Sequence, residues 1–291
     1  MVEGSHPVLF RDMQEDDLAG GLSLSRAAGW NQTLADWRYL LSLGPGLFRV
    51  GVADGRVVAA GGAVRYGEEL AWICMILVDP DVRGRGLGAR IFDEVGSRCE
   101  GEVRAGRLRA VGLDATPGGR RIYLQRGFAD GPGLVRMRAE PEAPARPPGA
   151  VRAVAARDLE AILSLDKEVF GADRSAVLRW ALGGAPELAW CAYAGARLRG
   201  YCFGRRGDHS DHVGPVVAED GAAALDLVRA CLSTARDRPL VVDARALPSW
   251  LTALGEMGFR EQRSFTRMYL GGARPPARPA LEPAVLGPEF G

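Results

Sequence analysis

The chain carries the same residue pattern twice. Residues near the start of each half match at an offset of 141, residues near the middle at 140, and residues near the end at 131. The matched positions are Arg11 with Arg152, Asp17-Leu18 with Asp158-Leu159, Ser23-Leu24 with Ser164-Leu165, Gly55 with Gly195, Arg65 with Arg205, Gly67 with Gly207, Gly127-Phe128 with Gly258-Phe259, and Arg136-Met137 with Arg267-Met268. Ordered matches with a slowly falling offset indicate a duplication, so the 291 residues are expected to form two copies of one fold.

Each copy reads as a mixture of strands and helices without strict alternation. Apolar runs separated by turn glycines predict strands and hairpins, and an amphipathic segment predicts a long helix in the second half of each copy. The predicted strands are 7–11, 48–53, 56–66, 69–78, 108–114, 150–153 and 240–243, and the predicted long helices are 88–104 and 222–235. In each copy the opening strand leads into a helical stretch that starts near an aspartate, Asp17 or Asp158, and a short helix and a final strand ending at Arg-Met close the copy. The expected fold class is α/β, with a mixed sheet of α+β character.

Proline-rich segments mark the expected domain borders. Residues 141–149 contain four prolines, and such a segment is stiff and cannot continue a helix or a central strand. We therefore expect one domain at 1–140, a linker at 141–149, a second domain at 150–271 and a tail at 272–291. For the tail, disorder and packing against a domain are both open.

Composition excludes several classes of protein. Lys plus Arg is 37 against Asp plus Glu 36, so no chain-wide basic field favours nucleic acid as a partner. The longest apolar run, 70–78, is too short to span a membrane, and the N-terminal residues do not resemble a signal peptide. The five cysteines are odd in number and never form a C-x-x-C pair, which favours free thiols in the cytoplasm and no zinc site. Monomer and homodimer both stay open.

The strongest chemical motif follows the apolar strand. Residues 72–88 read WICMILVDPDVRGRGLG, a buried strand that runs into a glycine-rich turn and then into a helix. Backbone N–H groups of such a turn and of the helix N-terminus converge on one place, which suits a pyrophosphate. The glycine spacing does not fit a dinucleotide-binding loop, the Gly-Lys-Ser/Thr of a P-loop is absent, and the Arg-Gly pattern does not repeat as it does in RNA-binding segments.

This segment resembles the coenzyme A loop of the GNAT superfamily of N-acetyltransferases. Val78-Asp-Pro followed by Arg83-Gly-Arg-Gly-Leu-Gly88 resembles the first signature, and residues 114–128, with Tyr123 five residues before Phe128, resemble the second. The layout of two copies and a tail is similar to tandem bacterial GNAT proteins, with a second copy that is degenerate.

The resemblance implies roles for matching residues. The backbone of Ile76, Leu77 and Val78 would pair with the pantetheine arm of acetyl-CoA as an added strand, and its N–H groups would polarise the thioester carbonyl. Tyr123 would contact the cofactor and protonate the departing thiolate as general acid, the alternative being a packing aromatic. The pyrophosphate would be held by Arg83, Gly84, Arg85, Gly86, Leu87 and Gly88.

The second copy lacks both the glycine-rich loop and the tyrosine. The offset falls from 139 at Val217 to 129 at Asp243, so about ten residues are missing, and Ala218-Glu-Asp-Gly-Ala222 stands in place of the loop. Acidic residues there would repel a pyrophosphate, and Leu254 stands at the position of Tyr123. We expect that this copy does not bind acetyl-CoA and either completes the acceptor pocket or supports the first copy.

The base and the acceptor residues stay open. Glu68 and Glu69, just before the central strand, could take the proton of an acceptor ammonium, or could be exposed turn residues. Asp166, Asp173 and Arg174 in the second copy are candidates for binding the acceptor. His209 and His212 are interpreted as a loop pair, without a third residue to make a metal site.

These patterns predict an acetyl-CoA-dependent N-acetyltransferase. It would move an acetyl or acyl group to a primary amine of a small molecule by direct attack in a ternary complex, without a metal. The alternatives are a non-catalytic acyl-CoA-binding regulator and a protein lysine or N-terminal acetyltransferase.

Overall fold

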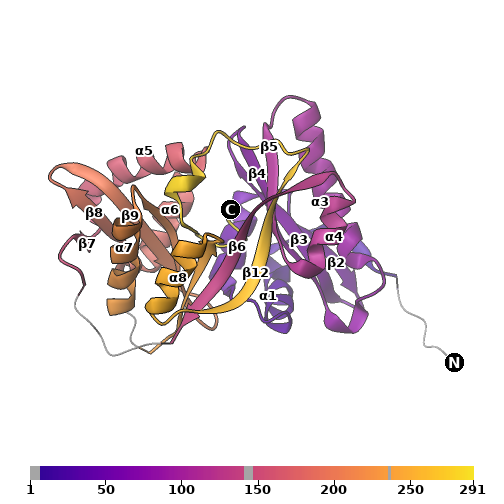
Figure 1. Cartoon of the computed structure of the whole chain (residues 1–291). Helices are drawn as coiled ribbons and strands as arrows, with labels where there is room; N and C mark the ends of the chain where they lie inside the picture. Colours follow the sequence, from indigo (N-terminus) through magenta and orange to yellow (C-terminus); the bar gives the residue numbers. More distant parts are fainter. Residues whose placement is uncertain (1–6, 141–146, 235–236) are drawn as a thin grey trace. The chain divides into compact units, whose positions relative to one another are not determined.

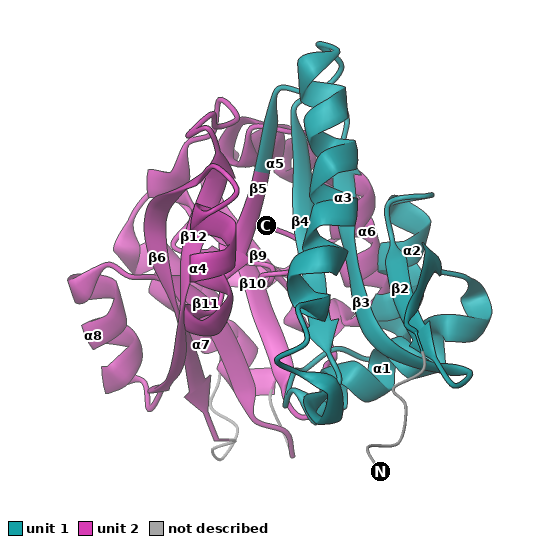
Figure 2. Cartoon of the chain, turned by 90° about the vertical axis from the view of Figure 1, so that its right-hand side faces the viewer, with its two compact units in different colours: residues 1–111 teal, residues 112–291 magenta. Residues whose placement is uncertain are grey.

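The computed structural model describes residues 7–140, 147–234 and 237–291. The chain divides into two compact units, residues 1–111 and residues 112–291, which are described separately here (Figure 2). The strands are β1 Leu9–Asp12, β2 Arg49–Ala53, β3 Arg56–Tyr66, β4 Leu70–Val78, β5 Ala110–Ala115, β6 Phe128–Ala139, β7 Val151–Ala153, β8 Trp190–Ala194, β9 Arg197–Arg205, β10 Asp211–Ala218, β11 Leu240–Arg245, β12 Arg260–Leu270 and β13 Ala284–Val285. The helices are α1 Leu18–Ala27, α2 Leu34–Leu43, α3 Leu87–Arg104, α4 Pro117–Leu124, α5 Leu159–Phe170, α6 Ser175–Gly184, α7 Gly221–Thr234 and α8 Pro248–Glu256.

Unit 1 is an antiparallel sheet in the order β1-β2-β3-β4, with α3 packed on β2, β3 and β4. Ile91 and Val95 of α3 recur at helical spacing and are fully buried, which explains why this stretch folds as an amphipathic helix. Thr33 begins α2 by accepting a hydrogen bond from the backbone of Asp36, whose carboxylate bonds back to Thr33.

Unit 2 has the strand order β5-β12-β6-β11-β13-β10-β9-β8-β7. Strands β10 and β11, which flank β13 in this order, also pair directly with each other in parallel over Asp211–Val213 and Leu240–Val242. The neighbours in this order pair antiparallel over the described residues, so the sheet is mixed as the sequence predicts. One face carries the hydrophobic core, where Val242, Leu227 and Leu254 are completely buried between the strands and helices α7 and α8.

The final strands of the two copies are exchanged. Strand β12, from the second copy, pairs with β5 of the first copy and with β6, while β6, from the first copy, pairs with β11 of the second (Figure 1). Matched residues accordingly pair crosswise. Arg136 binds both oxygens of Asp243 at 2.8 and 2.7 Å, and Arg267 binds both oxygens of Asp114 at 2.9 and 2.8 Å.

The duplication is confirmed at the start of each copy. Arg11 donates to both oxygens of Asp17 at 2.6 and 2.8 Å, and the matched Arg152 donates to both oxygens of Asp158 at 2.7 Å. Each of these ion pairs ties the first strand of its copy to the start of its first helix. The strands and long helices predicted from sequence are present, whereas α2 and α6 were not predicted.

The borders of the compact units differ from the expected domain borders. Because of the strand exchange, the compact units divide at residues 111 and 112, whereas the duplicated segments divide near the proline-rich linker. Linker residues 141–146 lie outside the described residues. The tail packs within unit 2, where Leu286 and Phe290 are completely buried. Over the described residues, no helix has the length and apolar character needed to cross a membrane.

Candidate cofactor loop and acyl-transfer site

Strand β4 ends in a bulge. Its register with β3 shifts between the pairs Gly62–Cys74 and Ala60–Leu77, and Met75 has a left-handed φ of 59°. A non-glycine residue in this conformation costs about 1–3 kcal/mol, and such strain is common at functional sites. Gly61 lies opposite the bulge, where a Cβ would overlap the side chains of Ile76 and Ile91. The bulge therefore lies next to residues 76–78, whose backbone is predicted from the sequence to bind the pantetheine arm and the thioester carbonyl.

The loop after β4 is built by its own backbone and one aspartate. Asp79 accepts a hydrogen bond from Asp81 N at 3.0 Å and so begins a single turn at Pro80–Val82. Gly84 and Gly86 then adopt left-handed φ values of 79° and 77°, which other residues rarely adopt. A Cβ at either glycine would meet no atom within 4 Å, so their conformation rather than crowding accounts for glycine here.

The loop ends at the N-terminus of α3. Gly86 is the N-cap of this 18-residue helix and offers no side chain to its first N–H groups. These N–H groups and the helix dipole favour an anion. Arg83 and Arg85 are exposed beside them, and Arg83 Nε donates to Val78 O at 3.2 Å. The donors present fit a pyrophosphate, as a coenzyme A site requires.

Tyr123 lies in unit 2, on the helix that follows β5. Thr116 caps this helix by accepting from Gly119 N at 3.3 Å, and the Tyr123 ring packs 6.5 Å from the ring of Phe128. The side chain is 8% exposed, and burial raises the pKa of its hydroxyl well above the ordinary value. A phenol with a raised pKa keeps its proton at neutral pH and can donate it.

Glu68 and Glu69 lie in the turn between β3 and β4. Glu68 is exposed, Glu69 is partly buried, and their backbone oxygens accept from Arg109 N at 2.8 Å and Ala110 N at 3.1 Å. A strand rises about 3.3 Å per residue, so seven residues separate Glu69 from Ile76 by roughly 23 Å. Glu68 and Glu69 thus lie in a turn at the opposite end of β4 from residues 76–78, and their role as base stays a prediction.

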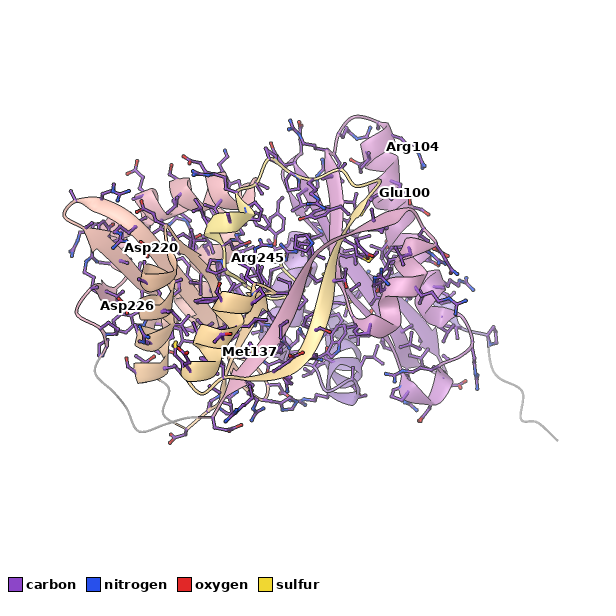
Figure 3. All side chains as sticks on the ribbon, in the orientation of Figure 1. Glu100, Arg104, Met137, Asp220, Asp226 and Arg245 are labelled. Carbon is purple, nitrogen blue, oxygen red and sulfur yellow. The ribbon has the colours of Figure 1, made fainter. Side chains whose placement is uncertain are left out.

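The corresponding helix of the second copy is capped differently. Asp220, labelled in Figure 3, lies at the start of α7. It accepts from Ala223 N at 2.9 Å, and this bond lowers the pKa of its carboxyl. Glu219 and Asp220 also form ion pairs with Arg199. The N-terminus of α7 is thus capped by a carboxylate of the chain itself, whereas the N-cap of α3, Gly86, has no side chain to do so.

The three candidate acceptor residues do not form one group. Asp166 and Arg174 are both buried, bonded to each other at 2.8 Å, and Arg174 also binds Glu282 at 2.8 Å. Asp173 is exposed and accepts from Ser175 N, the first residue of α6, at 2.9 Å. Asp166 and Arg174 therefore belong to an internal ion-pair network, and Asp173 stabilises a helix end.

His209 and His212 lie in different surroundings. His209 is exposed, with Nε2 3.5 Å from Asp208, whereas His212 is a completely buried residue of β10 with Nε2 3.4 Å from Asp243. The interpretation of both as loop residues is wrong for His212. In the part of the chain that the structure describes, no group of three or more His, Cys, Asp or Glu side chains could hold a metal ion.

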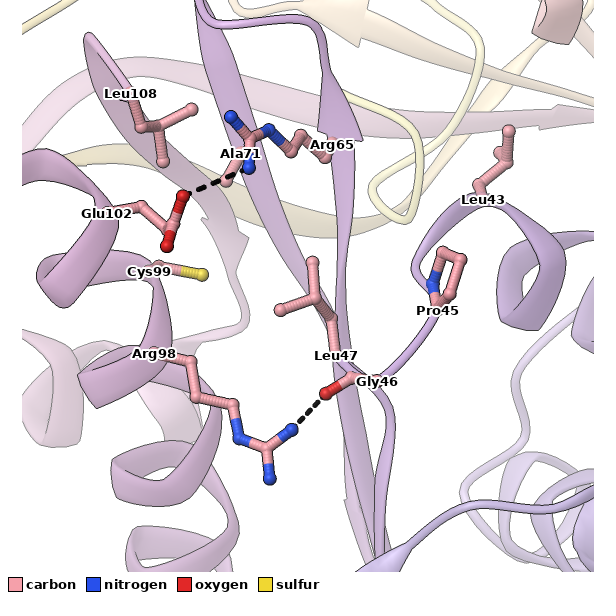
Figure 4. A pocket seen from close by; sticks show the side chains of 10 residues that line it. All are labelled: Leu43, Pro45, Gly46, Leu47, Arg65, Ala71, Arg98, Cys99, Glu102 and Leu108. Atoms are coloured by element: carbon pink, nitrogen blue, oxygen red, sulfur yellow. Dashed lines mark hydrogen bonds and ion pairs between the residues drawn. The ribbon is translucent and has the colours of Figure 1, made fainter. Parts of the chain in front are cut away.

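A pocket of about 440 Å³ opens in unit 1 between α3 and the beginning of β4 (Figure 4). Ala71 and Cys99 contribute apolar surface, and Arg65 pairs with Glu102 at 3.1 Å. Ala71 precedes Val78 by seven residues, so this pocket lies roughly 23 Å along the strand from the glycine-rich loop. It contains none of the predicted site residues.

The chain is similar to known acyltransferases in both halves. Residues 45–130 and residues 162–280 each match a family model described as an acetyltransferase (GNAT) domain. Holothin acyltransferase of Pseudoalteromonas sp. (strain SANK 73390) is 25% identical over 247 residues, which make up 84% of this chain and 82% of that protein.

Solved structures share the fold over nearly the whole chain. A Pyrococcus horikoshii protein classed as an acetyltransferase has a TM-score of 0.76 at 20% identity, covering 99% of this chain and 98% of its own. A GCN5-related N-acetyltransferase from Sphaerobacter thermophilus has a TM-score of 0.66 at 19% identity, covering 91% and 96%. A tandem GNAT protein from the clavulanic acid biosynthesis pathway has a TM-score of 0.60 at 16% identity, covering 90% and 98%.

Proposed function

We propose that this chain, which belongs to the acetyltransferase (GNAT) family and carries two such domains in tandem, is an acyltransferase that uses acyl-coenzyme A. It transfers an acetyl or acyl group to a primary amine of a small molecule. The observation that carries the proposal is the pair of left-handed glycines before the uncapped N-terminus of α3, directly after the bulge of β4. The name of the holothin acyltransferase supports acyl transfer.

Each part of the first copy has a task in this reaction. When bound, acyl-coenzyme A supplies an activated thioester. The loop at 83–88 holds the pyrophosphate through backbone N–H groups and the two arginines. The backbone at residues 76–78 binds the pantetheine arm and hydrogen-bonds the carbonyl oxygen as negative charge develops on it.

The chemical step is a direct displacement. The neutral amine nitrogen forms a bond to the thioester carbonyl carbon, the carbon–sulfur bond breaks, and the amide and the free thiol leave. Tyr123, whose phenol is protonated at neutral pH, donates its hydroxyl proton to the departing sulfur and is reprotonated by solvent. The amine's own proton passes to solvent or to a base, for which Glu68 and Glu69, acting directly or through water, are the candidates. No covalent acyl-enzyme is formed.

The test is free-thiol release from acetyl-CoA with a panel of small amines. Tyr123→Phe should lower kcat about 100-fold or more while coenzyme A affinity stays the same, because general acids contribute on that scale. Tyr39→Phe, a partly buried tyrosine of α2, is the control and should keep wild-type kcat. Binding of acetyl-CoA without thiol release for any amine would favour the regulator instead, and no binding would refute both.

A further inference from the structure

Strands β10 and β11 of the second copy separate, and the tail lies between them. They pair directly only over Asp211–Val213 and Leu240–Val242. Beyond these residues β13 enters the gap, where Ala284 pairs with Val216 on one side and with Ala244 on the other. Arg245 N donates to Pro283 O at 2.8 Å, which continues the same strand pairing. The tail is thus an added strand that joins two diverging parallel strands.

This gap corresponds to a defined place in the first copy. At the local offsets of 139 and 129, Val216 matches Leu77 and Ala244 matches Ala115. Leu77 is one of the residues whose backbone pairs with the pantetheine arm in the proposed function, on which this correspondence rests. The tail therefore takes, in the second copy, the place given to the cofactor arm in the first.

Two buried carboxylates fix the tail to the second copy. Glu282 accepts from Arg174 at 2.8 Å and from Arg245 at 2.6 Å, and its own backbone oxygen accepts from Arg245 Nε at 2.6 Å. Glu289 forms an ion pair with Arg205. All five side chains are at most 8% exposed. Each carboxylate has a specific guanidinium partner, as a bound ligand would.

Apolar contacts and one close approach complete the fit. Val285, Leu286 and Phe290 are completely buried, and the Phe290 ring packs 5.5 Å from that of Trp180. At Gly214 of β10 a Cβ would overlap the carbonyl oxygen of Val285, so the strand admits the tail only because a glycine stands there.

We infer that the second copy contains a peptide-binding cleft whose ligand is residues 282–290 of the chain itself. The ligand class is an extended acidic peptide bound by strand addition. With this ligand in place, the cleft is closed to the pantetheine arm of any acyl-coenzyme A, independently of the missing glycine-rich loop.

Cutting the folded chain tests the inference. A protease recognition sequence inserted at 272–274, where all three residues are exposed, allows the tail to be released covalently after the intact protein has folded. The cleaved tail should stay with the body through size-exclusion chromatography and native mass spectrometry at micromolar protein. Loss of the tail from the cleaved wild type under these conditions would overturn the inference.

Matched tail variants show what holds it. Glu282→Gln combined with Glu289→Gln should speed release of the cut tail at least 10-fold, because all three buried ion pairs of the two carboxylates are lost. Arg278→Gln should not, because Arg278 is exposed and pairs only loosely, at 3.6 Å, with exposed Glu168. Equal release rates for both variants would contradict the proposed binding mode.

Cofactor stoichiometry separates this inference from the proposed function. The uncut chain should bind one equivalent of coenzyme A in native mass spectrometry, and two equivalents would overturn the closure of the second cleft. Zero equivalents would refute the cofactor site of the first copy and with it the correspondence, while retention of the cut tail would still establish the peptide cleft.

Discussion

Single residues at two helix starts separate the copies chemically. At α3 the N-cap is Gly86, which leaves the first N–H groups to an external anion, whereas at α7 the carboxylate of Asp220 already accepts from Ala223 N at 2.9 Å. A helix N-terminus attracts negative charge in either case. What differs is whether the chain supplies that charge itself, as Asp220 does at α7 and no side chain does at the N-cap of α3.

Gly86→Ala should weaken coenzyme A binding about 10-fold. Alanine at a φ of 77° is strained, so the loop shifts and its N–H groups no longer converge on the pyrophosphate. Gly106→Ala, at the other end of the same helix with a φ of 70° and equally open surroundings, carries the same strain without touching the loop. Isothermal titration with coenzyme A measures both, and equal losses for the two variants would show that general destabilisation, not loop geometry, is responsible.

The glycine-rich loop could be predicted from sequence because its chemistry is local. The glycines, the arginines and the following helix are contiguous, so their pattern alone indicates an anion site. The bulge at Met75 could not be predicted, since a positive φ in an apolar strand leaves no local sequence pattern. The pair Gly61-Gly62 on the facing strand is the one sequence feature that accompanies the bulge. The base assignment to Glu68 and Glu69 depended on proximity along the chain, and an extended strand carries them away from residues 76–78.

At the scale of elements, β10 and β11 enclose a cluster of buried charges. His212 of β10 faces Asp243 of β11, with Arg205, Arg136 and Glu289 close enough to affect it. Burial lowers the pKa of His212 to about 4, and Arg205 and Arg136 add to this while Asp243 and Glu289 oppose it. The histidine is therefore neutral in the folded protein at neutral pH.

A neutral buried histidine makes stability depend on pH. Because the folded pKa of about 4 lies below the ordinary value of 6.5, the unfolded chain takes up the proton first as pH falls. The full stabilisation is present above pH 6.5 and is lost as pH falls towards 4, with a total of about 3 kcal/mol from the relation between pKa shift and free energy. Urea unfolding between pH 4 and 7.5 should show this slope in wild type and in His209→Gln, but a reduced slope in His212→Gln. The same slope in all three proteins would refute the assignment.

The elements themselves were largely predictable, and their partners were not. Turn glycines and apolar alternation located the hairpins and the long helices, because those patterns are local. Helices α2 and α6 were missed, although they are as long as α1. The similar ends of the two copies, Arg136-Met137 and Arg267-Met268, give no information about which sheet each strand joins, because either position satisfies the same alternation. The exchange of β6 and β12 is decided by tertiary packing alone.

For the whole molecule, this exchange makes each copy depend on the other. Strand β5 of the first copy, which leads into the helix of Tyr123, has β12 of the second copy as its partner, and β12 is in turn held by β6. The two crosswise ion pairs, Arg136 with Asp243 and Arg267 with Asp114, have side chains at most 4% exposed. The second copy thus supplies the strand beside β5, which leads into the helix of Tyr123.

Residues 1–140 and 150–291, produced separately, should therefore fail to fold alone. Each half would leave one arginine and one aspartate of the crosswise pairs without its partner, and breaking a buried pair costs about 3–5 kcal/mol, a large part of the stability of a domain. Co-expressed halves should form a one-to-one complex with cooperative thermal unfolding and amine-dependent thiol release, because β6 and β12 can then pair again.

The control for that experiment is the intact chain cut within 141–146 after folding, which should stay associated and active. Circular dichroism of each half, with size-exclusion chromatography of the mixture, gives the readout. A cooperatively folded, monomeric 1–140 fragment that binds coenzyme A would show that the first copy needs no exchanged strand. A folded dimer of 150–291 would instead show that a second β12 can replace β6, and that the exchange selects a strand of the right pattern rather than the strand of the other copy.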